Sequence, residues 1–197
     1  MNNAQLVGED MVAAAIPPGF PSAEEVELLW RIGLFSSDDE RALRKLWRVL
    51  KGQTDDYLDM VLGMVAAYPA LATALAAVCQ ENIMTASADG SATVRRLFRQ
   101  WLSETCFSPH EPPWLKRLYS LYSDLPPERS AQTISAALPG FRYLIALSFP
   151  LVATVRSLLV SGGLAAQEIE RMQSAFLKAI LLQVTILSKL YVKGELW

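Results

Sequence analysis

The feature that most constrains this chain is the long apolar stretch Leu138–Lys193. The stretch divides at Gly162-Gly163, and glycine is the residue that most readily takes the left-handed conformation just past a helix end. Its first half is apolar almost all round, which is typical of a helix that packs on more than one side. Its second half has apolar residues at three- and four-residue steps, and after Ala179 it too is apolar on nearly every face. We therefore expect two long helices, over 138–160 and 165–191, whose apolar surface must be covered.

The composition also points to extra buried surface. Of the 197 residues, 52% are hydrophobic and 19% are charged, which lies on the apolar side of the range for a globular domain. This length suffices for one domain with its own core, so we expect the surplus to lie in an interface or a ligand cavity. The net charge of −2 argues against a nucleic-acid partner, because no basic stripe is present to neutralise phosphates.

The sequence shows no targeting signal and no membrane span. Its N-terminus lacks a basic region and carries Glu9 and Asp10, unlike a secretory signal peptide. The most apolar run, Leu144–Val155, is shorter than the roughly 18 apolar residues of a spanning helix, so we expect a buried helix there. Cys79 and Cys106 lie far apart without a CxxC pattern, which favours a reduced, cytoplasmic protein.

The chain before the apolar stretch has the pattern of a series of helices. Prolines at positions 17, 18 and 21 predict an extended lead-in over residues 1–21. Ser22-x-x-Glu25 and Ser37-x-x-Glu40 are capping boxes, in which the two side chains satisfy free amide groups at a helix start. Further helical patterns begin near Thr54, Ala70, Ser91 and Trp114. Because there is no strand signal, the sequence predicts a single all-α domain of about eight helices over residues 22–197.

Several short motifs follow one another in a fixed order over most of the chain. The most specific is Gly140-Phe-Arg-Tyr-Leu-Ile-Ala, with Pro150 inside the same helix. The others are Leu58-Asp-x-x-x-Gly63 with Pro69, Val94-Arg-Arg-Leu-Phe-Arg-Gln-Trp-Leu with Thr105, Glu168-x-Glu-x-Met172, Lys178-Ala, Leu182-Gln-Val and Tyr191-Val-Lys193. From about Ile16 to Trp197 this order resembles the protoglobin family, the single-domain relatives of the globin domain in globin-coupled sensors.

The resemblance implies a globin-like fold, in which the helix from Ser22 is an extra helix before the globin core. It also implies a haem pocket between the helix of Phe98 and the helix of Tyr119, and a homodimer through the last two helices. The apolar outer faces of those two helices point to the same dimer, because a chain of this size cannot cover them alone. We expect four residues on the dimer face: Phe149, Leu182, Ile186 and Leu190.

The implied pocket departs from the family at most of its key positions. The family's iron ligand is a histidine, which corresponds here to Leu125, and leucine has no lone pair to offer iron. Four other positions that are aromatic or basic in the family are aliphatic here: Val61, Leu62, Leu97 and Leu147. Phe98 is kept, and Tyr122 lies almost one helical turn before the ligand position. We expect these seven residues to line an apolar pocket, and we expect no cofactor, although haem is the family's.

Four other side chains could ligate haem iron in principle. His110 is the single histidine of the chain, and it lies alone in a proline-rich loop. Cys106 could bind iron as a thiolate, and Tyr119 or Tyr122 could bind it as a phenolate. A solvated loop position explains His110 more simply, and core packing explains the other three.

Three functions remain open from the sequence. We favour a non-haem globin, a sensor or binding module whose apolar pocket takes an apolar or tetrapyrrole-like ligand, or none. The alternatives are a haem-binding gas sensor with an unusual axial ligand, and a structural or partner-binding dimer with a collapsed pocket. Enzyme activity is not expected, because a serine–histidine–aspartate arrangement would depend on His110 alone and no metal-binding motif is present.

Overall fold

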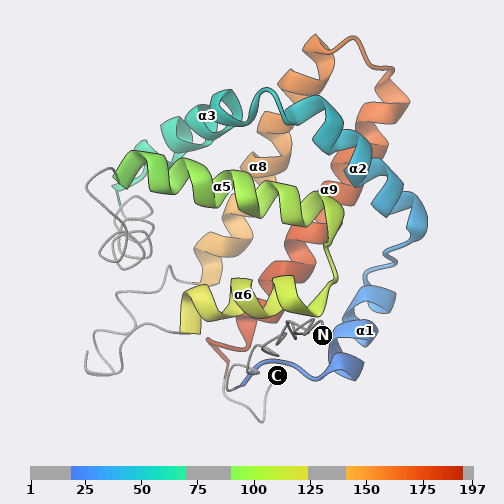
Figure 1. Ribbon diagram of the computed structural model, residues 1–197, viewed down its shortest axis with the longest axis vertical. Helices are drawn as coiled ribbons and strands as arrows, with labels where there is room; N and C mark the ends of the chain where they lie inside the picture. Colours follow the sequence, from blue (N-terminus) through green and yellow to red (C-terminus); the bar gives the residue numbers. More distant parts are fainter. Residues whose placement is uncertain (1–18, 70–89, 124–140, 193–197) are drawn as a thin grey trace, which may run out of the picture.

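The computed structural model describes residues 19–69, 90–123 and 141–192 (Figure 1). In the second of these ranges, side chains are described from Arg95 to Ser120. The three ranges contain seven helices and no strand, so the all-α class is confirmed for the part of the chain that the structure describes. The short helix expected from Ala70 lies outside the described residues, as does the pocket position Leu125.

The helix bounds follow the sequence pattern to within a few residues. In chain order the helices are α1 (Ala23–Ile32), α2 (Ser37–Leu50), α3 (Thr54–Ala66), α5 (Gly90–Phe107), α6 (Pro112–Ser123), α8 (Phe141–Ser161) and α9 (Ala166–Ser188). The two long helices expected in the apolar stretch are α8 and α9, each somewhat shorter than expected.

Capping residues set where the first two helices begin. At α1, Ser22 Oγ accepts from the amide of Glu25 and the Glu25 carboxylate accepts from the amide of Ser22, so the expected capping box is confirmed. The second box lies one residue earlier than expected, with Ser36 and Asp39 in the two roles. Ser36 has extended backbone and is the N-cap, so Asp39 rather than Glu40 is the third residue of the helix, and the Glu40 carboxylate pairs with Arg44.

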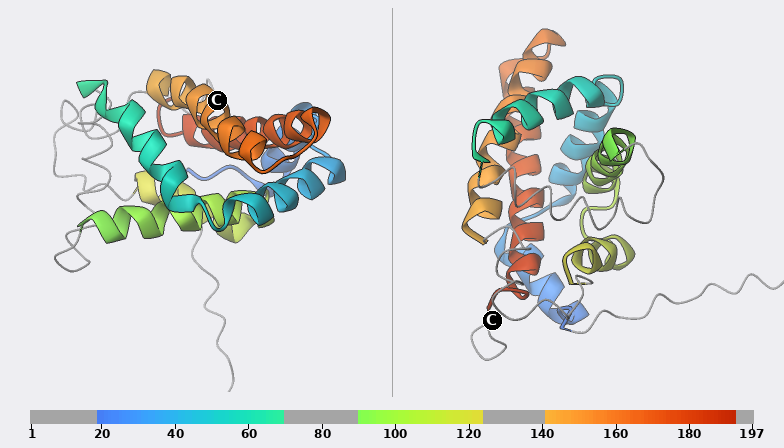
Figure 2. Two further views of the ribbon diagram at one scale, coloured as in Figure 1. Left: turned by 90° about the horizontal axis from the view of Figure 1, so that it is seen from above. Right: turned by 90° about the vertical axis from the view of Figure 1, so that its left-hand side faces the viewer.

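The helices form two layers, seen edge-on in the left view of Figure 2. One layer contains α8 and α9, which run antiparallel and meet at the Gly162-Gly163 turn, where Gly163 has a φ of 71°. The other layer contains α2, α5 and α6, and α3 slants from this layer toward α8. Helix α1 lies at the end of the molecule where α9 finishes, and the Glu25–Lys189 ion pair joins the two at 3.6 Å.

Helix α9 is the centre of the core. It packs against α8, α2, α5, α6 and α1, which cover most of its apolar residues after Ala179, while Leu181 is 40% exposed. Lys178 of α9 also links helices. Its ammonium group donates to the Asp39 carboxylate at 3.0 Å and to the Leu34 carbonyl at 2.9 Å, which connects α9 to α2 and to the turn after α1.

Candidate functional site

The structure brings only some of the expected pocket residues together. Val61 of α3 is buried in the main core, and Phe98 of α5 and Leu147 of α8 pack against that core while remaining partly accessible. Leu97 is also partly buried. Leu62 is 39% exposed, because its position next to Val61 on α3 turns it about 100° away from that buried residue, and its place in a pocket stays a prediction.

Two further pocket positions cannot be placed. Leu125, the expected proximal position, lies outside the described residues. Tyr122 belongs to the described backbone of α6, but its side chain is not among those described.

Tyr57 is the residue of this region that the sequence reasoning missed. It is fully buried, its ring lies 5.3 Å from that of Phe98, and its hydroxyl donates to the Leu151 carbonyl of α8 at 2.8 Å. Burial raises the pKa of Tyr57 far above its ordinary value, so the phenol is protonated and acts only as a neutral donor. Its spacing of four residues from Val61 on the inner face of α3 was the available signal.

The interior beyond Phe98 is filled by the chain's own side chains. The ring of Phe98 lies 5.4 Å from that of Trp101, which in turn lies 6.0 Å from Phe176 of α9. The Trp101 indole donates to the Gln183 side-chain oxygen at 3.0 Å, and the Gln183 amide group donates to the Thr105 hydroxyl at 3.0 Å. These contacts close the space between α5 and α9 with apolar rings and with polar groups that satisfy one another.

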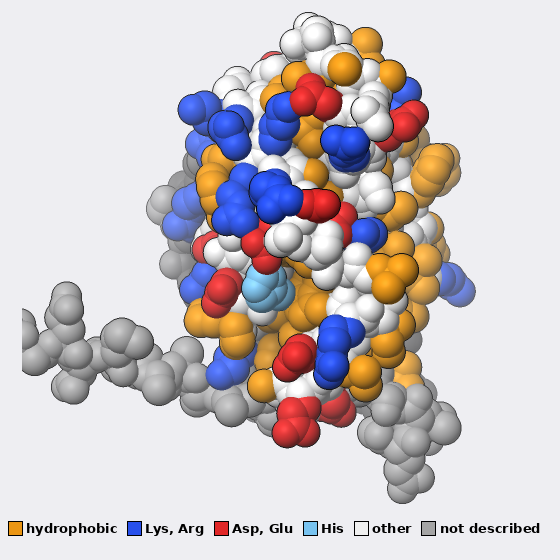
Figure 3. Space-filling model, turned by 90° about the vertical axis from the view of Figure 1, so that its right-hand side faces the viewer, with side chains coloured by type: hydrophobic (Ala, Val, Ile, Leu, Met, Phe, Trp, Pro, Cys, Tyr) orange, Lys and Arg blue, Asp and Glu red, His pale blue; other side chains and the backbone are white. Residues whose placement is uncertain are grey.

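Two of the candidate iron ligands, His110 and Cys106, lie in different surroundings. His110 lies at the surface (Figure 3), with its ring edge-on to those of Trp30 and Phe35 and its Nδ1 atom 3.9 Å from the Glu40 carboxylate. Cys106 is buried, and burial raises the pKa of its thiol to about 12, so it is no thiolate at neutral pH.

The buried ring of Tyr119 is covered by the end of the lead-in. The Phe20 ring meets it edge-on at 5.5 Å, and a Cβ atom on Gly19 would lie only 3.1 Å from its hydroxyl oxygen. Burial also raises the pKa of Tyr119, which disfavours a phenolate ligand. Cys106 and Tyr119 are thus unsuited to bind iron as a thiolate or a phenolate, and the absence of haem stays a prediction.

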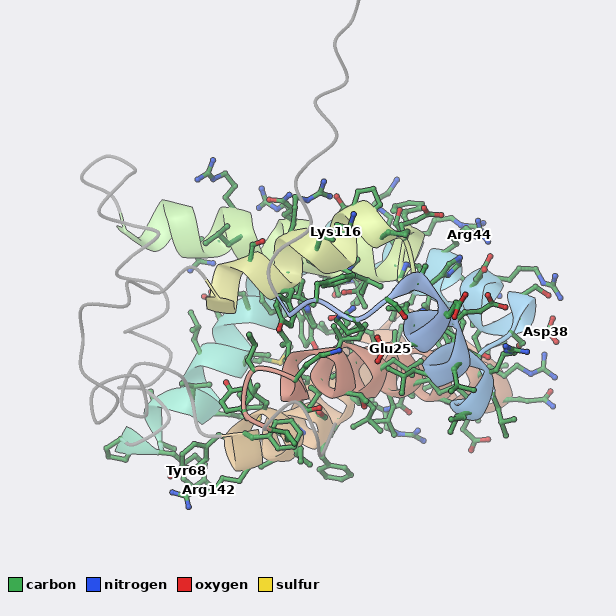
Figure 4. The ribbon with its side chains drawn as sticks, turned by 90° about the horizontal axis from the view of Figure 1, so that it is seen from below. Glu25, Asp38, Arg44, Tyr68, Lys116 and Arg142 are labelled. Carbon is green, nitrogen blue, oxygen red and sulfur yellow. The ribbon has the colours of Figure 1, made fainter. Side chains whose placement is uncertain are left out.

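Helix α8 presents an apolar outer face. Among the described helices it alone is long and apolar enough to cross a membrane by length and composition, yet only 22% of its most apolar window is buried in the chain. Its buried residues form one stripe, while Ile145, Phe149 and Val160 are exposed on the other side, Phe149 by 75%. In Figure 4 the labelled Arg142, at the start of α8, lies at the outer edge of the molecule, far from Lys116 of α6. The expectation of a buried helix is corrected for this outer face.

The expected dimer residues divide between this face and the interior. Phe149 lies on the outer face of α8, and Leu190 is partly buried. Leu182 is 7% exposed and Ile186 is 2% exposed, so both already lie inside the single chain and their placement on an outer face is corrected. The sequence could not separate the two helices, because both are apolar on most faces and only packing decides which one is central.

No family model matches this chain, and no curated protein matches it either. The described residues also contain no group of three or more histidine, cysteine, aspartate and glutamate side chains placed to hold a metal ion. The outer face of α8 is the candidate site, and it is a largely apolar surface on which Arg142 and Arg156 are the exposed charges.

Proposed function

We propose that this chain is a haem-free, globin-like interaction module that works as a homodimer, with α8 as its contact face. The observation that carries the proposal is the accessibility of α8, the most apolar of the described helices, along a side that holds Ile145, Phe149 and Val160. An apolar surface of this kind marks an interaction site, because soluble monomers rarely leave a large contiguous apolar patch in water.

The outer face of α8 suits a second copy of itself. Large side chains alternate there with the small exposed residues Ala146, Ala153 and Ser157. In an antiparallel pair of α8 helices, Phe149 of each copy can lie opposite Ala153 of the other, so large side chains meet small ones. The serine and threonine hydroxyls of α8 donate to carbonyls of the same helix, so they need no partner across the interface. The exposed Arg156 on this side donates to the Gln173 side chain of α9.

We favour a second copy over a lipid bilayer as the cover of this face. The inner side of α8 packs along α9 and α3, and α9 carries exposed charges at Glu170 and Arg171. Inserting α8 into a membrane would separate it from these helices or bring their charges toward the hydrocarbon. We also propose a cytoplasmic location, in keeping with the free thiol of Cys106.

Several features support a globin-like arrangement of the protoglobin kind. The described part holds an extra helix, α1, before the others, and a long antiparallel pair, α8 and α9, at its end. Helices α3 and α5 pack on one another, with α8 against α3 and α9 against α5. Helix pairs crossing around a central interior are the basis of the globin fold.

A second candidate function is the binding of an apolar ligand at this interior. It is favoured by the partial accessibility of Phe98 and Leu147, whereas the neighbouring Tyr57 and Val61 are buried. Mass analysis of protein purified from its own host tests this function, and the absence of any stoichiometric small molecule would argue for a closed interior.

The homodimer is tested by multi-angle light scattering of the wild-type chain at tens of micromolar. A dimer would show twice the 21.8 kDa mass of one chain. Its interface should bury more than about 1,000 Å² in total, as stable protein interfaces do. A monomer that does not bind vesicles of neutral and anionic lipid would contradict the proposal. A monomer that does bind them would assign the face to a membrane surface instead.

A further inference from the structure

Three consecutive carbonyl groups in the middle of α8 each accept a hydrogen bond from a side chain. The Pro150 carbonyl accepts from Thr154 of the same helix at 2.7 Å. The Leu151 carbonyl accepts from the Tyr57 hydroxyl of α3 at 2.8 Å, and the Val152 carbonyl accepts from the Gln173 side-chain amide of α9 at 3.0 Å. The middle of α8 is therefore held from two neighbouring helices at once.

These bonds surround the weakest point of the helix. Pro150 lies inside α8 and has no N–H group to donate to the carbonyl of Ala146, so the helix lacks one of its own hydrogen bonds there. Proline inside a helix also crowds the preceding turn and is a usual cause of bending. Phe149, the most exposed apolar residue of the outer face, directly precedes this proline. The direction in which α8 bends at this point therefore determines where Phe149 lies.

Each bracing side chain makes a second contact. The Tyr57 ring is fully buried against Phe98, so its hydroxyl has no freedom to move away from α8. The Gln173 side-chain oxygen accepts from Arg156 at 2.7 Å, which orients its amide group toward Val152. A fixed donor on each side can select one bend of a helix that proline has loosened.

We propose that Tyr57 and Gln173 are positioning residues, which hold α8 around Pro150 in the one geometry that lets its outer face pair with a second copy. This inference rests on the proposed homodimer and names what controls its contact face. Loss of either brace leaves the core packing intact but lets the two halves of α8 vary in relative direction. Two faces that no longer match in shape then associate more weakly.

The test uses two nearly isosteric variants, each with a matched control. Tyr57→Phe removes only the hydroxyl, and Tyr119→Phe removes a buried hydroxyl that no α8 contact uses. Gln173→Glu keeps an oxygen for Arg156 but loses the donor to Val152, and Gln167→Glu makes the same charge change at an exposed site on α9. The readouts are the dimer dissociation constant from sedimentation equilibrium and amide hydrogen exchange across residues 151–158.

We expect each brace variant to raise the dimer dissociation constant roughly three- to tenfold and to speed exchange in 151–158, with both controls within about twofold of wild type. Unchanged dissociation constants for both brace variants would overturn the inference while leaving the homodimer standing. Faster exchange without weaker association would overturn it too, because the braces would then serve stability alone. A monomeric wild type would remove the homodimer itself, and the inference with it. If Tyr57→Phe fails to fold, Gln173→Glu decides alone.

Discussion

Leu34 occupies a backbone conformation that favours glycine. It has a φ of 50°, it is 77% exposed, and it directly follows Gly33, whose φ is negative. Space is tight at position 33, where a Cβ atom would lie 3.2 Å from the Leu182 side chain of α9. We predict that Leu34→Gly raises the free energy of unfolding by about 0.5–1 kcal/mol, since it removes left-handed strain but adds freedom to the unfolded chain. Urea denaturation measures this, and Gly33→Ala is the control that should lower stability.

Asp39 gives the chain a pH-dependent contribution to stability. Burial alone would raise its pKa, but hydrogen bonds from Lys178 and Ser36 outweigh burial and hold the pKa below its ordinary value. A lowered folded pKa means that the stabilisation is fully present above the unfolded pKa of about 3.9 and is lost as the pH falls through the folded pKa. We predict that Asp39→Asn lowers the free energy of unfolding by about 2 kcal/mol at pH 7 and that the difference from wild type shrinks below about pH 4.

Denaturation curves between pH 2.5 and 7 measure the effect of Asp39→Asn. Lys178→Met should show the same loss at neutral pH, and the double variant should lose much less than the sum of the two, because the partners act as one unit. A pH-independent difference between Asp39→Asn and wild type would show that the carboxylate charge has no part in the effect.

At the scale of helices, the junction of α5 and α9 depends on one buried amide. Gln183 is the shared partner of the Trp101 indole and the Thr105 hydroxyl, and both Gln183 and Thr105 are buried. We predict that Gln183→Leu lowers the free energy of unfolding by about 2–3 kcal/mol, because it leaves an indole N–H and a hydroxyl without partners inside the core. Chemical denaturation measures the loss, and Gln167→Leu on the exposed side of α9 is the matched control. A loss below about 0.5 kcal/mol would mean that the two groups find other partners.

The helices also show which features of the fold could be predicted from the sequence and which could not. Helical periodicity and the capping box at Ser22 locate the helices well, because they are local signals. Local sequence patterns do not show which of α8 and α9 is more deeply buried, since both helices are apolar on most faces. Only the packing of α1, α2, α5 and α6 around α9 shows that Leu182 is interior and Phe149 exterior. The role of Tyr57 escaped prediction for a similar reason, because its partner carbonyl belongs to α8, far away in sequence.

At the scale of the whole molecule, the surroundings of the described candidate ligands lead to a spectroscopic prediction. We predict that hemin added at one equivalent gives no sharp Soret band, because Cys106 and Tyr119 are buried and protonated and His110 is a lone surface side chain beside Glu40. Absorbance titration measures this, and Leu125→His tests the resemblance itself by placing imidazole at the family's ligand position. A stoichiometric spectrum for wild type that is lost in Cys106→Ala, His110→Ala or Tyr122→Phe would overturn the prediction and name the ligand.

Two glutamate substitutions with different expected consequences test which surface forms the homodimer. Phe149 is exposed on α8, so Phe149→Glu should leave the chain folded, with a helical circular dichroism spectrum and a melting temperature close to wild type. It should nevertheless convert the dimer to a monomer in light scattering, because an unpaired charge would be buried in an apolar interface. Leu182 lies inside the chain, so Leu182→Glu should instead abolish folding at any protein concentration. A Phe149→Glu protein that remains dimeric would show that the copies associate through another surface, and a folded monomer of Leu182→Glu would return α9 to the interface.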